Sequence, residues 1–212
     1  DLRTPLTMIK AYGEALRDLK DDNPAQKHKD LSVIISESDR LAGLVDDLLE
    51  LSRMQAGHIS LNPAPFSLTA LIEGVLSSYK LYSDRDGYDI RFEHDGDITV
   101  SADEKRILQV MHNLLINAIN HSGPDKRVTV RQLIQPDSVR IEVCDTGDGI
   151  SPEELPYIWD RYFRAGKTHK RPVAGSGLGL SIVKAVLEQH GARYGVLSSE
   201  KAGSTFWFEL IR

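Results

Sequence analysis

Apolar residues recur at intervals of three and four along the first quarter of the chain. A polar stretch rich in helix breakers, DLKDDNPAQ, separates two such runs. The positions are Leu2, Leu6, Ile9, Gly13 and Leu16 in the first run, and Leu31, Ile34, Ser38, Leu41, Val45, Leu48 and Ser52 in the second. This spacing is typical of helices that pack along a narrow seam, so it predicts an antiparallel helical hairpin over residues 1–57.

A hairpin with so narrow an apolar stripe cannot bury that stripe alone. Two copies of the chain would bury it in a four-helix bundle. Residues 1–57 are therefore expected to form a dimerisation module, and the chain a homodimer. The alternative is a hairpin that packs only against the second half of its own chain.

The pattern changes after Gly57, where HISLNPAPFS brings prolines and turn residues. Residues 58–67 are expected to be a linker, and residues 68–212 a second domain with mixed periodicity. Helices are expected at about 68–83, 102–121, 152–160 and 178–190, and strands at about 89–94, 97–100, 127–134, 138–145, 194–199 and 204–211. This order predicts an α+β chain, in which the helical hairpin precedes an α/β sandwich with helices on one face of a mostly antiparallel sheet.

Two of the expected helices have clear start signals. Ser101 with Glu104 matches a capping box. Ser151 is followed by Pro152, which would occupy the first helical position. We therefore expect helices to begin at both places.

Composition narrows the class of protein. Hydrophobic residues make up 41% of the chain and charged residues 27%, which is typical of globular proteins, and no run approaches the roughly 20 apolar residues of a membrane-spanning helix. The formal net charge of -5 argues against a nucleic-acid partner. The single Cys144 excludes an internal disulfide and a multi-cysteine zinc site, and its place in VRIEVC indicates a small buried hydrophobe rather than a catalytic thiol.

A helix with repeated asparagines is the first of three stretches that a plain core does not explain. In QVMHNLLINAINHS, Asn113, Asn117 and either Asn120 or His121 follow one another at intervals of three or four. Asparagine is a poor helix former because its side chain competes for backbone hydrogen bonds. Amide oxygens on one helix face can ligate a hard cation such as Mg²⁺, although a solvated polar face explains the same pattern.

The second stretch is DTGDGI, which directly follows the expected strand SVRIEVC. Its alternate glycines, Gly147 and Gly149, permit close approaches that side chains would block. Asp145, at the end of the strand, can accept a hydrogen bond from an exocyclic amine. A hairpin turn built on Asp148 and Gly149 is the alternative.

The third stretch is AGSGLGLSIVK, where Gly175, Gly177 and Gly179 lead into an apolar helix. Backbone N–H groups at such a helix N-terminus can bind phosphates. The spacing matches neither the Rossmann pattern nor the P-loop pattern, so a dinucleotide enzyme and a P-loop ATPase are disfavoured. The preceding loop carries cations, among them Arg164 and Lys167, that either meet nucleotide phosphates or are solvated.

Taken in this order, the three stretches resemble the ATP-binding domain of sensor histidine kinases, part of the superfamily that includes gyrase and the mismatch-repair ATPases. HNLLINA matches its N box, DTGDGI its first glycine box, IWDRYF its aromatic box, GSGLGLSIVK its second glycine box and GSTFWF a final Gly-Thr element. The upstream DLRTPL resembles the phosphorylation signature His-Asp/Glu-Leu-Arg-Thr-Pro-Leu without its first residue. The chain is therefore expected to begin one residue after the phosphoacceptor histidine.

This resemblance implies a site for ATP and Mg²⁺. It assigns Mg²⁺ to Asn117 with Asn113 nearby, and the adenine amine to Asp145, with the next two glycines allowing the base to approach. The further nucleotide contacts that it implies are Asn120, His121, Gly147, Gly149, Phe163, Lys167, Gly175, Gly177, Leu178, Gly179, Leu180 and Thr205. Asn120 and His121 depart from the family, which often has Lys or Arg followed by Tyr or Phe at these positions.

The resemblance also implies catalytic roles. Asp1 would polarise or deprotonate the acceptor imidazole, which raises its nucleophilicity. Thr4 would help to place water for dephosphorylation of a partner regulator. Arg164 and Lys167 would neutralise charge at the transferring phosphoryl group.

The expected function is that of an ATP-dependent protein-histidine kinase, which forms a homodimer and passes its phosphoryl group to an aspartate of a response regulator. Dephosphorylation of the regulator can share the same residues. The alternatives are a non-catalytic dimeric scaffold that binds the regulator and a gyrase-like ATPase without histidine transfer. The family further implies that the chain is the cytoplasmic portion of a bacterial membrane sensor, whose sensor region would lie upstream.

Overall fold

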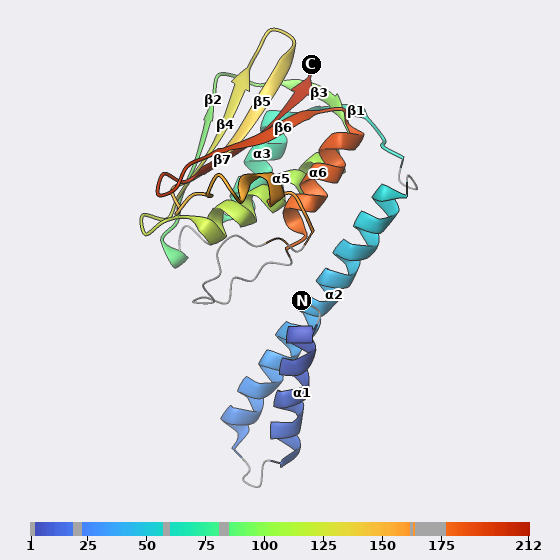
Figure 1. Ribbon diagram of the computed structural model, residues 1–212, viewed down its shortest axis with the longest axis vertical. Coiled ribbons are helices and arrows are strands. Elements are labelled where there is room, and N and C mark those ends of the chain that lie inside the picture. The colour runs from blue at the N-terminus through green and yellow to red at the C-terminus, as the bar shows by residue number, and fades with distance from the viewer. Residues whose placement is uncertain (1–2, 19–22, 57–59, 81–84, 162, 164–176) are drawn as a thin grey trace. The chain divides into compact units, whose positions relative to one another are not determined.

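The computed structural model describes residues 3–18, 23–56, 60–80, 85–161, 163 and 177–212. The chain divides into two compact units, residues 1–53 and residues 54–212. Helices make up the described part of the first unit, whereas the second unit combines helices with strands (Figure 1). A helical part followed by a mixed part is the order that the hydrophobic pattern predicts.

The first unit contains α1 (Arg3–Asp18) and most of α2 (Pro24–Gln55). The two helices run in opposite directions (Figure 1), as the heptad pattern predicts. Helix α2 begins with a proline, whose missing N–H costs no hydrogen bond at that position. The Asn23 side chain accepts a hydrogen bond from the Gln26 backbone N–H at 3.2 Å and so caps the helix.

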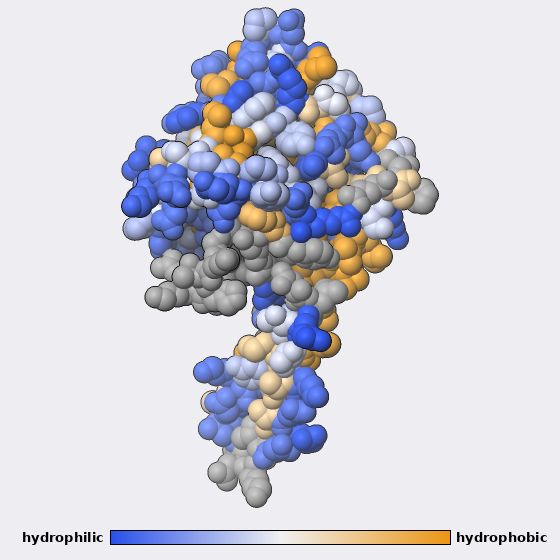
Figure 2. Space-filling view, viewed as in Figure 1, coloured by the Kyte–Doolittle hydropathy of each residue, from blue (hydrophilic) through white to orange (hydrophobic). Residues whose placement is uncertain are grey.

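Large apolar side chains on the first unit are exposed in the single chain. Three belong to the predicted seam: Leu6, Leu31 and Val45 are 59%, 48% and 40% exposed. Ile35 and Leu49 are exposed as well, although the heptad pattern does not include them. Figure 2 shows a strip of apolar and weakly polar side chains along this unit, with hydrophilic side chains on both flanks. The hairpin therefore leaves apolar surface that it does not bury by itself.

The second unit is built on a five-stranded sheet with the strand order β2-β4-β5-β7-β6. The strands are β2 (Asp89–His94), β4 (Arg127–Ile134), β5 (Ser138–Asp145), β6 (Arg193–Ser198) and β7 (Ser204–Ile211). Only the β2 and β4 pair is parallel, and the other neighbours in this sheet are antiparallel. The prediction of a mostly antiparallel sheet is confirmed.

Helices α3 (Leu68–Ser78), α5 (Glu104–His121) and α6 (Gly179–Gln189) lie on the same face of this sheet (Figure 1). The core forms between them because every second residue of the central strands points inward. The buried side chains include Val139, Ile141 and Val143 of β5, Phe206 and Phe208 of β7, and Met111 and Leu115 of α5. The predicted α/β sandwich is therefore confirmed.

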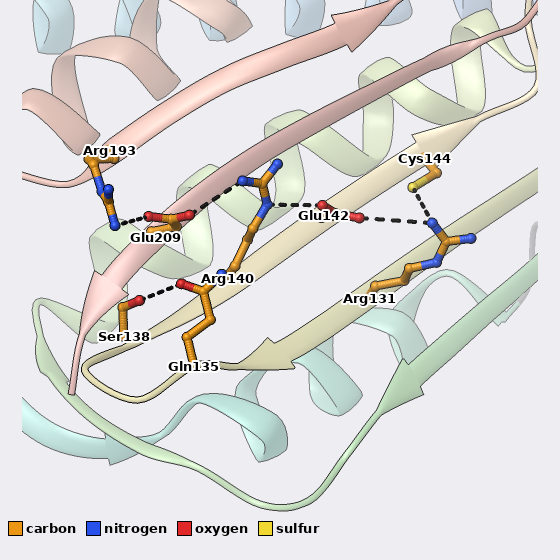
Figure 3. Close-up of polar contacts among 8 residues, drawn as sticks. All are labelled: Arg131, Gln135, Ser138, Arg140, Glu142, Cys144, Arg193 and Glu209. Carbon is orange, nitrogen blue, oxygen red and sulfur yellow. Dashed lines mark hydrogen bonds and ion pairs between the residues drawn. The ribbon is translucent and has the colours of Figure 1, made fainter.

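The opposite face of the sheet is polar (Figure 3). A row of ion pairs crosses the strands: Arg193 to Glu209 at 2.6 Å, Glu209 to Arg140 at 3.3 Å, Arg140 to Glu142 at 2.9 Å, Glu142 to Arg131 at 3.8 Å, and Arg131 to Glu93 at 3.0 Å. The Arg140 guanidinium also lies 4.0 Å from the centre of the Trp207 ring, at which distance a cation–π attraction operates. Because its charges are paired, this face of the sheet does not need a layer of helices to cover it.

Cys144 lies on the same outer face, beside Arg131 (Figure 3). Burial raises the pKa of its thiol, although Thr205 and Arg131 lower it. A thiol with a raised pKa is protonated at neutral pH and is a poor nucleophile. The structure therefore does not favour a catalytic thiol, but Cys144 is half-buried on the polar face and is not the buried hydrophobe that the sequence predicts.

The residues expected to form a linker end in a strand. β1 (Ala64–Ser67) pairs antiparallel with β3 (Thr99–Ala102), and the two form a separate small sheet. Pro65 is tolerated because an edge strand does not need every N–H for its ladder. The strands expected from the sequence did not include Ala64–Ser67, and the role of residues 58–67 as a linker stays a prediction.

Helix α5 begins where it was expected, but its cap is Asp103 and not Ser101. The Asp103 carboxylate accepts a hydrogen bond from the Arg106 backbone N–H at 3.2 Å. Ser101 cannot cap the helix because it lies in β3, where it pairs with Pro65. The capping box predicted from Ser101 and Glu104 is therefore wrong.

The helix expected at residues 152–160 is also wrong. The structure has turns there, with a single 3-10 turn at Leu155–Tyr157. Pro156 lies in the middle of this segment, where its missing N–H and its ring prevent an α-helix from continuing. The start signal acts only locally: the Glu154 N–H donates to the Ser151 carbonyl at 3.0 Å, and the Ser151 hydroxyl donates to the Glu154 carboxylate at 3.2 Å.

Candidate nucleotide-binding site

Asp145 ends strand β5 with its carboxylate in the interior of the second unit, only 6% exposed. One carboxylate oxygen, Oδ1, accepts hydrogen bonds from the N–H groups of Gly147 at 2.9 Å and Ser204 at 3.3 Å. Among the described residues, none donates a hydrogen bond to the other oxygen, Oδ2. Asp145 is thus held by one oxygen and can accept a hydrogen bond from an amine with the other.

Burial raises the pKa of Asp145 to about 6, although the two backbone N–H groups lower it. The cause is desolvation, which disfavours the charged carboxylate. The group is still mostly ionised at pH 7, and an ionised carboxylate is the form that accepts from an amine at both oxygens.

The glycines after Asp145 are required by neighbouring backbone. A side chain at Gly147 would collide with the carbonyl of His121, at the end of α5. Gly149 has a φ of +72°, and a side chain there would collide with the carbonyl of Ser199. These contacts hold the loop against α5 on one side and the β6–β7 turn on the other. That the same glycines admit a base stays a prediction.

The β6–β7 turn supports the loop through further hydrogen bonds. The Lys201 N–H donates to the Asp148 carbonyl at 2.6 Å, and the Ile150 N–H donates to the Ser198 hydroxyl oxygen at 2.9 Å. No strand follows the loop within the described residues 146–161, so the alternative of a hairpin built on Asp148 and Gly149 is not what the structure shows.

Asn113 of α5 lies against the beginning of α6. The Asn113 amide donates to the Gln109 carbonyl at 3.0 Å, and its Oδ1 lies 2.9 Å from the position that a Cβ of Gly179 would take. Asn117 follows one turn later and is half-buried, and no hydrogen bond to another described residue is found for its side chain. Amide oxygens are hard donors that suit Mg²⁺, so these side chains fit a magnesium ion that is shared with phosphates.

Among the residues that the structure describes, no side chain caps the first turn of α6. Leu178 precedes it with a buried side chain, and Gly177 has a φ of +68°. The opening N–H groups of the helix, at Gly179 and Leu180, therefore face outward from the helix end without a capping side chain. Such an end attracts anions through these N–H groups and the helix dipole.

Other predicted residues lie at different places. Asn120 is exposed near the end of α5. His121, which ends it, is also exposed, and desolvation lowers the pKa of its ring against the opposing effect of the Asp148 carboxylate. Phe163 is half-buried, with its ring centre 6.2 Å from that of Tyr157. Thr4 is exposed in the first turn of α1, in the other unit.

Four predicted site residues lie outside the described part of the chain. They are Asp1, Arg164, Lys167 and Gly175. Their roles stay predictions. The described residues contain no cluster of three or more His, Cys, Asp and Glu side chains that could hold a metal ion.

Thr205 is not brought to Asp145. It is the register partner of Cys144 and so lies on the outer face of the sheet. Its neighbour Ser204 lies beside Asp145 instead, and sequence reasoning missed it. The strand period contained the signal, because residues two apart share a face and Phe206 belongs to the core.

The aromatic segment before the undescribed residues 164–176 is fixed to the sheet. The Trp159 ring packs edge-on against Tyr194 of β6 and Phe206 of β7, with centre distances of 5.0 and 5.8 Å. The Tyr194 hydroxyl donates to the Glu188 carboxylate at 3.0 Å, and burial with this neighbour raises the pKa of Tyr194 to about 12. Trp159 therefore ties residues 155–161 to the sheet.

Comparison with known families finds two matches, one in each part of the chain. Residues 102–212 match the family described as histidine kinase-, DNA gyrase B- and HSP90-like ATPase. Residues 1–57 match the His Kinase A (phospho-acceptor) domain. Sensor protein SrrB of Staphylococcus aureus (strain N315) is 31% identical over 210 residues, which are 99% of this chain. The chain spans 36% of the length of that relative.

Solved histidine kinases have the same fold. The crystal structure of ThkA in complex with the response regulator protein TrrA has a TM-score of 0.78 and 27% identity, over 99% of this chain and 58% of that one. Full-length ShkA in complex with AMPPNP has a TM-score of 0.75 and 25% identity, over 98% of this chain and 46% of that one.

No helix in the described part of the chain has the length and apolar character needed to cross a lipid bilayer. The motifs, the sandwich fold and the matches of both halves lead to one assignment. The chain belongs to the histidine kinase-, DNA gyrase B- and HSP90-like ATPase family and, through its phospho-acceptor domain, to the sensor histidine kinases of two-component systems.

Proposed function

We propose that the chain is the catalytic core of an ATP-dependent protein-histidine kinase. It binds Mg-ATP, phosphorylates a histidine immediately before Asp1, and transfers the phosphoryl group to an aspartate of a response regulator. The observation that carries this proposal is the buried Asp145 carboxylate, which keeps one oxygen for an amine and shares a unit with the uncapped end of α6.

The two ends of the site are spaced to fit one nucleotide. Helix α5 meets the Asp145 loop at His121 and the start of α6 at Asn113. These positions are eight residues apart, which is about 12 Å along a helix axis. An extended nucleotide covers a span of this size, with its base at Asp145 and its phosphates at Gly179.

Each residue of the site then has a role. Asp145 accepts a hydrogen bond from the adenine amine, and the N–H groups of Gly179 and Leu180 bind the phosphates. Asn117, with Asn113 beside it, holds Mg²⁺, which would neutralise phosphate charge when bound. Arg164 and Lys167 add positive charge near the γ-phosphate. The ATP-binding family and the AMPPNP complex of ShkA support this arrangement.

The phosphoryl group moves in two steps. An imidazole nitrogen of the acceptor histidine attacks the γ-phosphorus, the bond to the bridging oxygen breaks, and ADP leaves. Asp1 polarises the imidazole and takes up its proton. An aspartate carboxylate of the regulator then attacks the phosphorus of the phosphohistidine, the P–N bond breaks, and the imidazole leaves and takes up a proton. Thr4 places a water molecule that later hydrolyses the aspartyl phosphate of the regulator to aspartate and inorganic phosphate.

Two partners belong to this function. A second copy of the chain would cover the exposed apolar side chains of α1 and α2 in a four-helix bundle. A response regulator would dock on the same helical part, and the complex of ThkA with TrrA supports a regulator as partner. In this assignment residues 1–57 serve dimerisation and phosphotransfer, residues 58–67 connect, and residues 68–212 bind the nucleotide. The chain would be the cytoplasmic portion of a membrane sensor, as the sensor kinase relatives suggest.

Phosphorylation from γ-labelled ATP tests the proposal. Two chains are compared with Mg²⁺ present: the printed sequence, and the same sequence extended upstream by its natural residues. We expect acid-labile, alkali-stable label on the extended chain only. Bound ATP without label on either chain would contradict the kinase and favour a scaffold. ATP hydrolysis without label would favour a gyrase-like ATPase.

A further inference from the structure

The segment that follows α5 is built against the Asp145 loop. It comprises residues 122–126, Ser-Gly-Pro-Asp-Lys, and leads from His121 into strand β4. The Thr146 hydroxyl donates a short hydrogen bond to the Asp125 carboxylate. Thr146 lies between Asp145, the proposed acceptor for adenine, and Gly147, whose N–H holds that carboxylate.

A second contact joins the segment 122–126 to the Asp145 loop. A side chain at Gly123 would collide with the Thr146 carbonyl, so the two backbones touch there. Together with the contact between Gly147 and the His121 carbonyl, the end of α5 and the segment after it meet the Asp145 loop at three points. The Asp125 contact is the only one of these three that a side chain makes.

Asp125 is presented by a braced turn. The Lys126 N–H donates to the Gly123 carbonyl at 2.9 Å, and Lys126 takes a positive φ of 49°. The Lys126 carbonyl accepts a hydrogen bond from the Asp89 N–H at 2.9 Å. The ammonium group of Lys126 donates a hydrogen bond to the Asp86 carbonyl at 2.6 Å. The carboxylate therefore has a fixed origin, from which it can hold Thr146 in place.

From this geometry we infer that Asp125 is a positioning residue for nucleotide binding, which acts through the Thr146 hydroxyl on the orientation of Asp145. The inference rests on the proposed function. Its physical content is preorganisation: a loop held in its binding geometry loses less entropy when the ligand arrives. Because Asp145 and Thr146 share a peptide unit, a shift of Thr146 changes the direction in which Oδ2 points.

The size of the effect follows from the exposure of the pair. Both Asp125 and Thr146 are exposed, so their hydrogen bond contributes modestly. Without Asp125 the Thr146 hydroxyl still has the Arg127 carbonyl at 3.4 Å as a weaker acceptor. We therefore expect Asp125→Ala to weaken ATP binding about three- to tenfold. Asp125→Asn keeps an acceptor oxygen and should stay within about twofold of the unaltered chain.

The experiment measures the ATP dissociation constant by calorimetry on the whole 212-residue chain. The variants are Asp125→Ala, Asp125→Asn, Thr146→Val and the double variant Asp125→Ala with Thr146→Val. The matched control is Asp137→Ala, which makes the same charge change at an exposed residue just before β5, at the opposite end of that strand from Asp145. Thermal melting of each variant is measured alongside.

The expected result has three parts. Asp125→Ala and Thr146→Val each weaken ATP binding, the double variant is no worse than either single one, and Asp137→Ala leaves affinity unchanged. Rescue by Asp125→Asn separates a hydrogen-bonding role from one of charge. Unchanged ATP affinity in Asp125→Ala would overturn the inference and leave the proposed function standing. The same holds if the losses of affinity in the two single variants add up in the double variant. It also holds if Asp125→Asn or Asp137→Ala loses as much affinity as Asp125→Ala. An unaltered chain that binds no ATP would overturn both.

Discussion

The two units of the chain treat their apolar residues in opposite ways. The second unit buries a core of apolar side chains between one sheet and its helices, although Leu197 and Ile211 are exposed, and its outer face carries paired charges. The first unit leaves Leu6, Leu31 and Ile35 exposed on its helices. The second unit therefore has its own apolar core in the single chain, whereas the first unit has an apolar surface suited to a second copy.

The largest effect is expected where the second unit is most specialised. Asp145→Asn should weaken ATP binding at least about a hundredfold, because the amide turns a donor or a weaker neutral acceptor toward the adenine amine. The dimer should survive, since Asp145 belongs to the other unit. Calorimetry measures the affinity and light scattering measures the mass. Unchanged ATP affinity would refute the assignment of the site.

The difference between the two units is tested most directly in the first unit, by placing a charge on its exposed apolar surface. Ile35→Glu places a charge on a residue that is 60% exposed in the single chain, so the fold of that chain should tolerate it. In a dimer the same charge would be buried in an apolar seam, which costs several kcal/mol. We expect a monomer at micromolar concentration by light scattering.

Leu197→Glu is the matched control for this prediction. Leu197 is 62% exposed, but it lies on strand β6 of the second unit. The substitution should leave the mass of the protein unchanged. A dimer that survives Ile35→Glu, or one that Leu197→Glu disrupts, would show that the apolar surface of the first unit is not the dimer seam.

The difference between the units also decides what the sequence could predict. Strands 127–134, 138–145 and 204–211 lie where alternation and turn residues place them. The helix at residues 152–160 failed because a start signal does not outweigh an interior proline such as Pro156. Exposed Ile35 and Leu49 were missed because a strict heptad describes a narrower stripe than the one that this unit exposes.

In the candidate site, residue types were predictable but their neighbours were not. Motif matching selected Thr205, whereas the inward face of β7 belongs to Ser204. The need for glycine at position 147 comes from the His121 carbonyl, a contact that joins segments far apart in the sequence. Such long-range backbone contacts leave no periodic signal, so only the folded chain reveals them.

A smaller effect follows from the pKa of Asp145, which burial raises to about 6. Adenine recognition needs the ionised carboxylate, so affinity should be constant above pH 7 and fall about tenfold between pH 7 and pH 5. Adenosine is the probe, because it has no phosphate that titrates in this window.

The stability of the ligand-free protein should change in the opposite direction. The folded-state pKa lies above the ordinary value of 3.8, so the folded protein binds this proton more tightly than the unfolded chain. Protonation of Asp145 therefore contributes stability as the pH falls from about 6 toward 4. Thermal melting of the unaltered chain and of Asp145→Asn isolates this contribution.

For the binding experiment, adenosine affinity that does not change with pH would show that the Asp145 carboxylate does not bind the base.

The smallest effect is expected on the outer face of the second unit. Arg193 is 75% exposed and pairs with Glu209 at 2.6 Å, whereas Arg140 approaches the other oxygen of the same carboxylate at 3.3 Å. Arg193→Met removes the charged partner of Glu209 Oε2, while Arg140 stays at the other oxygen. Arg193 is exposed but Glu209 is only 8% exposed, so the free energy of unfolding should fall by about 1 kcal/mol in urea denaturation, between the values for exposed and for buried ion pairs. A loss above about 1.5 kcal/mol would mean that the row of ion pairs acts as a connected network, and that the second unit depends on its polar face as much as on its core.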